Sequence, residues 1–140
     1  RGFTIYDTSG SILYTSGNEL ETIATMYGHY PEARSGTKGE FKASLNSDTI
    51  GTGDTSSCWH VSPRPGNEPE NVEFGVFGDD PILFVNSERS SLIFVYDVTD
   101  PMAPVFKQAL PAGLEPEGGK AIPERNLYVV ASEVDDRGGK

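Results

Sequence analysis

Short runs of apolar and aromatic residues, separated by turn residues, recur along this chain. Residues 72–77 alternate apolar and polar positions, whereas residues 82–86 are mostly apolar. The first pattern is typical of a strand with one covered face, and the second of a strand covered on both faces. Two further runs, at residues 92–96 and 105–110, flank the turn signal Asp-Val-Thr-Asp-Pro. We therefore expect residues 71–110 to form a four-stranded antiparallel meander.

Three motifs of this pattern occur twice and in a consistent order. They are Glu-Pro-Glu-Asn at 68–71 with Glu-Pro-Glu-Gly at 115–118, Ile-Leu-Phe-Val-Asn-Ser-Glu at 82–88 with Leu-Tyr-Val-Val-Ala-Ser-Glu at 127–133, and Phe-Thr-Ile-Tyr-Asp at 3–7 with Phe-Val-Tyr-Asp at 94–97. A repeat of roughly 45 residues built from short strands is typical of a β-propeller blade. The sequence thus predicts an all-β fold, a β-propeller fragment of about two blades.

The repeat divides the chain into four segments. Residues 1–17 are interpreted as the end of a preceding blade, 68–112 as a complete blade and 113–140 as the start of the next. Residues 18–67 are interpreted as an insertion, although its length also fits a degenerate blade. A propeller needs at least about four blades to close its ring, and this chain supplies about two. We therefore expect the outer faces of its blades to be covered by further blades, from the same or other chains.

The insertion begins with a predicted helix over about residues 19–27. Asn18 and Glu21 have the spacing of a capping box, and Leu20, Ile23 and Ala24 share one helical face. From residue 31 to 67, Gly, Ser, Thr and Pro make up roughly half of the positions, which predicts a long loop.

The composition and net charge of the chain argue against several classes of function. The chain carries 21 acidic and 11 basic residues, for a net charge of −10. Nucleic-acid binding needs clustered Lys and Arg, so we expect no nucleic-acid partner, whereas an acidic surface suits divalent cations or minerals. The single cysteine, Cys58, excludes an internal disulfide. We also expect no membrane-spanning segment, since no apolar run approaches the necessary ~18 residues.

The repeated motif supplies the candidate metal ligands. Glu70 and Glu117 precede the expected inner strands of successive blades, which line the channel of a propeller. Converging carboxylates repel unless protonated or bridged by a cation, and calcium is the cation that accepts several such oxygens. The alternative is that each glutamate caps local backbone N–H groups. Glu88 and Glu133, which close the second strands, have the same two interpretations.

Other candidate residues are better explained structurally. Asp7 and Asp97 end third strands and suit turns in which the side chain bonds the local backbone. Cys58 and His60 could share a face of an extended segment, but no orienting acid accompanies them, which argues against a nucleophilic pair. His29 follows a helix-ending glycine and is expected at the surface. We therefore predict no catalytic residue.

The ordered set of motifs resembles the choice-of-anchor I family, which includes mesenchyme-specific cell-surface glycoproteins associated with biomineralisation. The residues that carry this resemblance are the segments 3–7, 93–101, 115–118, 121–123 and 127–134, together with the helix that follows Ser16 and Gly17. The resemblance implies a secreted or cell-surface propeller, serving adhesion, matrix or mineral association. Calcium, expected from the repeated glutamates, is the predicted cofactor. A more distant similarity to propeller phosphatases and esterase-like phytases provides the alternative, a calcium-dependent phosphoesterase.

Overall fold

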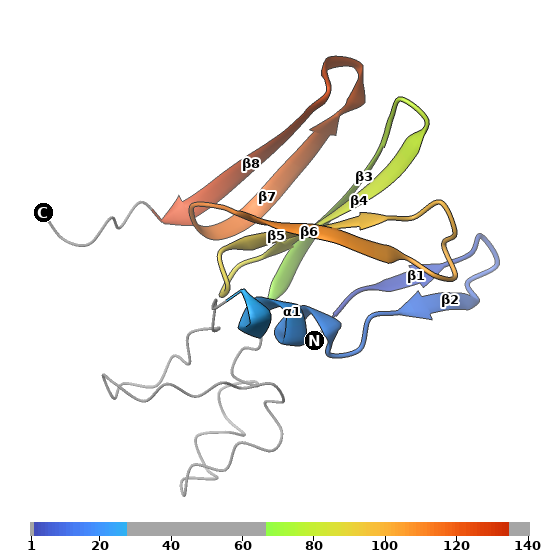
Figure 1. Cartoon of the computed structure of the whole chain (residues 1–140), viewed down its shortest axis with the longest axis horizontal. Helices are drawn as coiled ribbons and strands as arrows, with labels where there is room; N and C mark the ends of the chain where they lie inside the picture. The colour runs from blue at the N-terminus through green and yellow to red at the C-terminus, as the bar shows by residue number, and fades with distance from the viewer. Residues whose placement is uncertain (1, 28–66, 135–140) are drawn as a thin grey trace, which may run out of the picture.

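Antiparallel strands dominate the computed structural model, which describes residues 2–27 and 67–134 (Figure 1). The central sheet has four strands in sequence order: β3 (Pro69–Phe77), β4 (Asp80–Ser87), β5 (Leu92–Asp97) and β6 (Val105–Pro111). All three neighbouring pairs are antiparallel. The predicted meander is confirmed, and the fold is an all-β propeller fragment.

Two hairpins flank the central sheet. The first joins β1 (Thr4–Tyr6) to β2 (Ile12–Thr15), and the second joins β7 (Leu114–Ile122) to β8 (Leu127–Val134) through the 3-10 turn η1 (Pro123–Arg125). Figure 1 shows the two hairpins on opposite sides of the central sheet, β1–β2 in blue and β7–β8 in orange to red. The sequence pattern predicts strands over residues 3–6 and 12–15, which match β1 and β2, and over residues 121–122 and 127–131. The last of these lies within β8, whereas β7 begins earlier than expected, at Leu114.

The strand pairing repeats with the sequence. The β3–β4 register shifts between Pro69 and Asn71, and the β7–β8 register shifts at the corresponding residues, Pro116 and Gly118. Likewise, the shift in β1 between Ile5 and Tyr6 recurs in β5 at the equivalent Val95 and Tyr96. Therefore β7–β8 has the pairing of an inner strand pair, and β1–β2 has that of an outer strand pair.

Helix α1 (Glu19–Met26) confirms the predicted helix but not its predicted cap. Asn18 occupies the N-cap position, yet its side chain makes no capping hydrogen bond, and Glu21 is buried with 1% of its surface exposed. The helix is held instead by its apolar face, on which Leu20, Ile23 and Ala24 are buried. Tertiary packing thus stabilises a helix that is too short to be stable alone.

Two apolar cores lie on opposite faces of the central sheet. The first joins α1 and β1–β2 to one face, where Phe3 and Leu20 pack with Phe94 and Leu83. The helix that the sequence assigned to an insertion is therefore part of a core. This packing also covers β4 and β5 but leaves one face of β3 bare.

The second core joins the opposite face to β7–β8. Phe84, Ile93 and Val95 are its buried members, and Tyr128 packs against them. The ring of Tyr128 stacks on that of Phe84, with centroids 4.0 Å apart and an interplanar angle of 5°. Its hydroxyl donates a 2.6 Å hydrogen bond to Asn86 Oδ1 and occupies the space in which a Cβ at position 119 would lie. This close fit explains why glycine stands at position 119.

The predicted loop, apart from its last residue Asn67, lies outside the described residues, as do His29, Cys58 and His60. Nothing in the described structure tests the division into segments 1–17, 18–67, 68–112 and 113–140, which stays a prediction.

Candidate functional site

Six glutamates gather near the start of the first strand and the end of the second strand of two neighbouring blades. We call this set the acidic edge; its members are Glu68, Glu70, Glu88, Glu115, Glu117 and Glu133. Glu70 lies in β3 and Glu117 in β7, rather than just before these strands as the sequence analysis expected. Antiparallel pairing explains the gathering, because the start of one strand lies beside the end of the next.

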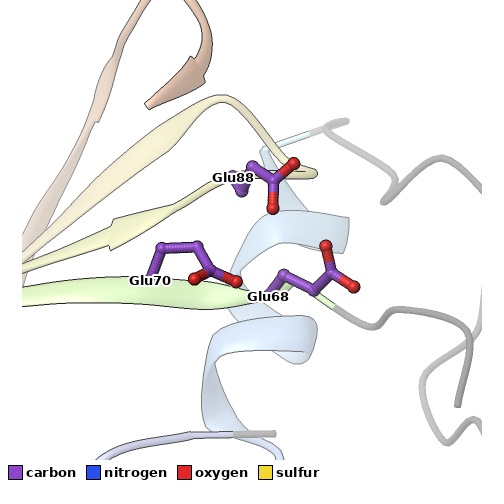
Figure 2. Close-up of side chains that lie close together, drawn as sticks. All are labelled: Glu68, Glu70 and Glu88. Atoms are coloured by element: carbon purple, nitrogen blue, oxygen red, sulfur yellow. The ribbon is translucent and has the colours of Figure 1, made fainter. Parts of the chain in front are cut away.

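Glu88 is the centre of the acidic edge. Its carboxylate belongs to one group with Glu68 and Glu70 and to a second group with Glu117 and Glu133; within each group, one oxygen per residue lies within 4.8 Å of the others. Figure 2 shows the first group, with Glu68 and Glu70 at the start of β3 and Glu88 just after β4. Glu88 is buried, with 5% of its surface exposed, whereas Glu70, Glu117 and Glu133 are exposed.

Arg89 supplies a cation to the same edge. Its guanidinium donates from Nε to Glu68 Oε2 at 2.7 Å and from Nη1 to Glu115 Oε1 at 2.6 Å. A third ion pair joins Nη2 to Glu88 Oε1 at 2.6 Å. Because Glu115 belongs to the next blade, this one side chain links two blades. The planar guanidinium, with several N–H donors in fixed directions, is suited to such a link.

The two glutamates that flank Arg89 are equivalent members of the repeat. Glu68 and Glu115 each precede a proline, and each has a left-handed backbone, with φ of 43° and 54°. Non-glycine residues seldom adopt this conformation, and it costs on the order of 1 kcal/mol or more. The fold retains it at both positions while the two side chains converge on one arginine.

Burial and neighbouring charges perturb Glu88. Burial raises the pKa of this carboxyl from an ordinary value of 4.5 to about 7, and the carboxyls of Glu68 and Glu115 add to the rise. The Arg89 guanidinium opposes the rise but does not cancel it. A buried carboxyl beside two others therefore holds a proton near neutral pH, despite its ion pair.

The raised pKa predicts a pH dependence of stability. Between pH 4.5 and about 7 the folded chain holds a proton on Glu88 that the unfolded chain releases, so the free energy of unfolding falls as pH rises through this window. We expect a fall of roughly 1–3 kcal/mol. Urea unfolding with chelator present, across this window, measures it. Glu88→Gln should flatten the slope; an unchanged slope in that variant would assign the pH dependence to other groups.

The two carboxylate groups differ in their capacity to hold a metal ion. In the first group, Arg89 is already bonded to Glu68 and Glu88, so a second cation there would lie beside a guanidinium. The second group shares Glu88, and with it the ion pair to Arg89, but its other two members, Glu117 and Glu133, are exposed and have no ion pair within the described residues. Oxygens within 4.8 Å of one another suit Ca²⁺, whose ligands lie 2.3–2.6 Å from the ion. The second group is the better metal candidate.

Four of the glutamates at the acidic edge, Glu70, Glu88, Glu117 and Glu133, are the candidate ligands predicted from the sequence, and the other members were not predicted. Glu70 and Glu117 were expected to converge directly; the structure places them in different groups, joined through Glu88. Glu68, Glu115 and Arg89 were overlooked. Glu68 and Glu115 could have been identified from the sequence, because both glutamates of the Glu-Pro-Glu motif are repeated.

The two aspartates interpreted as turn residues bond the backbone that follows them, Asp7 directly after β1 and Asp97 as the last residue of β5. Asp7 Oδ1 accepts hydrogen bonds from the backbone N–H groups of Ser9 and Ser11, and Asp97 Oδ1 accepts one from Thr99. The side-chain hydrogen bonds from Ser9 to Asp7 and from Thr99 to Asp97 are the largest cause that lowers the pKa of these carboxyls, and the backbone N–H groups lower it further. Their structural interpretation therefore accounts for their contacts.

The described strands and the acidic edge define a β-propeller fragment with a carboxylate cluster between two blades. The chain belongs to the choice-of-anchor I family: the choice-of-anchor I domain matches residues 1–101. This family membership points to an anchored or surface-associated protein. No curated protein and no solved structure gives a significant match. Within the described residues, no helix is both long and apolar enough to cross a membrane.

Proposed function

We propose that this chain is part of a non-enzymatic, extracellular or cell-surface propeller for adhesion or for matrix or mineral association, and that its acidic edge binds calcium. The observation that carries the proposal is the group formed by Glu88, Glu117 and Glu133 between two blades. Membership of the choice-of-anchor I family supports the surface location.

The chemistry of the donors favours calcium over other metals. Carboxylate oxygens are hard ligands, and Ca²⁺ tolerates six to eight of them in irregular geometry. Zinc prefers imidazole and thiolate ligands, and all members of the two carboxylate groups are glutamates. Burial, and to a smaller extent the carboxyls of Glu68 and Glu115, raise the pKa of Glu88. A bound Ca²⁺ would stabilise the ionised carboxylate, so calcium should also displace its proton.

Calcium titration of the chain tests this proposal. Isothermal titration calorimetry should detect binding that the double variant Glu117→Gln, Glu133→Gln loses. Glu124→Gln, an exposed glutamate in η1 outside the acidic edge, is the matched control and should bind as the wild type does. At a hundredfold excess of calcium over Kd, stability should rise by about 2.7 kcal/mol. Equal binding by the double variant would remove these glutamates from the site.

Association with a mineral is measured with the same variants. Depletion of the chain from solution by hydroxyapatite should be strong for the wild type and for Glu124→Gln. It should be weaker for the double variant, because fewer carboxylates face the calcium of the surface. If all three proteins adsorb equally, the net charge of −10 rather than the acidic edge governs adsorption.

The alternative function, a calcium-dependent phosphoesterase, requires cationic groups that are free to meet a phosphate. At the acidic edge, the guanidinium of Arg89 is already bonded to three carboxylates. The geometry therefore favours the non-enzymatic role. Calcium-dependent hydrolysis of p-nitrophenyl phosphate that disappears in the double variant would replace the proposal with this alternative.

A further inference from the structure

The acidic edge already contains one cation of its own, the guanidinium of Arg89. Its side chain is 11% exposed, and its ion pairs with Glu68, Glu88 and Glu115 are 2.6 to 2.7 Å long. It is therefore bonded to two of the three glutamates of the first group and to one glutamate of the next blade. A cation held by several carboxylates offsets their mutual repulsion, as a bound metal ion does. At this position the chain supplies that positive charge itself.

Only one of the two repeat units carries this cation. The three glutamates of each unit correspond residue by residue, but Arg89 follows the last one in the first unit and Val134 follows it in the second. Arg89 also reaches across the junction to Glu115, which belongs to the second unit. The other two glutamates of that unit are grouped with Glu88 and have no ion pair within the described residues. The positive charge is thus concentrated at the first group.

We propose that Arg89 selects the calcium site, by excluding the ion from the first group and confining it to the second. This role rests on the proposed calcium binding and names the residue that decides where the ion binds. A calcium ion in the first group would share the carboxylates of Glu68 and Glu88 with the guanidinium. The two cations would then lie well within the Debye length of about 8 Å, so salt would screen their repulsion only in part.

The second group avoids most of this repulsion. It shares only Glu88 with the guanidinium, and Arg89 bonds a single oxygen of that residue, Oε1. A carboxylate has two oxygens and can accept from a guanidinium while it also binds a metal ion. Glu117 and Glu133 are exposed, so an ion held there also keeps water ligands, which help to complete the six to eight positions that calcium requires.

Removing the guanidinium tests the exclusion. The variant Glu117→Gln, Glu133→Gln is expected to lose calcium binding while Arg89 is in place. Adding Arg89→Met to this double variant should restore binding through the first group, with a Kd at least about tenfold lower than that of the double variant, because the repulsion between the two cations is gone. Isothermal titration calorimetry with calcium chloride measures both. If a triple variant that is folded by circular dichroism does not bind more tightly, Arg89 does not exclude the ion, and the proposal is wrong.

Two matched variants separate the position of the charge from the net charge. In the double-variant background, Arg89→Lys keeps a positive charge at the acidic edge and should not restore binding. Lys120→Met removes one positive charge from an exposed ion pair outside the acidic edge, and it should not restore binding either. Recovery in Lys120→Met equal to that in Arg89→Met would attribute the effect to net charge and overturn the selecting role of Arg89.

A second test leaves Arg89 unchanged and so does not depend on the stability of its variants. Glu70 and Glu117 are both exposed and occupy equivalent positions in the repeat, but Glu70 belongs only to the first group and Glu117 only to the second. Glu117→Gln should raise the Kd for calcium at least about tenfold, because it removes a ligand, whereas Glu70→Gln should leave it nearly unchanged. Equal losses in the two variants would place the ion in the first group, beside Arg89, and overturn the proposal.

The same titrations distinguish failure of this role from failure of the proposed function. A wild-type chain that does not bind calcium contradicts the proposed function. If Arg89→Met alone then binds calcium, the exclusion by the guanidinium stands and extends to the whole acidic edge. If neither chain binds calcium, both proposals are wrong.

Discussion

Replacing Arg89 by methionine is expected to lower the free energy of unfolding by about 3–5 kcal/mol at mildly alkaline pH. The substitution keeps much of the side-chain length but removes the cation from Glu68, Glu88 and Glu115. Arg89 is largely buried, with 11% of its side chain exposed, so water replaces the lost partner only in part. Urea unfolding monitored by circular dichroism measures the loss.

An exposed ion pair provides the matched control for Arg89. Lys120 bonds Glu73 at 2.6 Å, but its side chain is 72% exposed, so Lys120→Met should cost only about 0–1 kcal/mol. The cost of Arg89→Met should shrink as pH falls below 7, because Glu88 then takes up a proton and loses its charge. A loss as small as that of Lys120→Met, at every pH, would show that the three carboxylates do not depend on Arg89.

Leu20→Ala is expected to cost about 2–5 kcal/mol, because it opens a cavity in the first core. Leu20 has none of its surface exposed and packs in the cluster that also holds Phe3 and Phe94. Met26, on the same helix, is 78% exposed and serves as the control; Met26→Ala should change stability by less than about 0.5 kcal/mol. Thermal and urea unfolding compare the two variants. Equal, small effects would mean that α1 is dispensable for the fold, as an insertion would be.

The repeat made the strands predictable, but a local pattern cannot show what an element packs against. The apolar face of α1 was visible from Leu20, Ile23 and Ala24, yet nothing in that spacing places it against Phe94, some seventy residues away. The start of β7 was missed for a related reason. Its first half contains Pro116 and adjacent glycines, which have low strand propensity, and pairing with β8 overrides that propensity.

The candidate site shows the same division between pattern and three-dimensional arrangement. The motif repeat identified Glu70 and Glu117, because equivalent positions in two blades stand out in a sequence. The central role of Glu88 depends on which side chains face it across two blades, and this is a property of the assembled sheets. Arg89 has no counterpart in the repeat, since Val134 follows Glu133, so repetition could not reveal it.

The fit between Gly119 and Tyr128 limits how such blades can be exchanged by recombination. The corresponding residues of the central sheet are Val72 and Leu83. The larger side chains therefore lie at different positions in the β3–β4 and β7–β8 strand pairs. A chimaera that placed any larger residue at position 119 would displace the Tyr128 hydroxyl from Asn86 and disturb its stacking on Phe84. Glycine is therefore required at position 119 wherever Tyr128 is kept. For this reason the two blades cannot be exchanged for one another, although they share one sequence pattern.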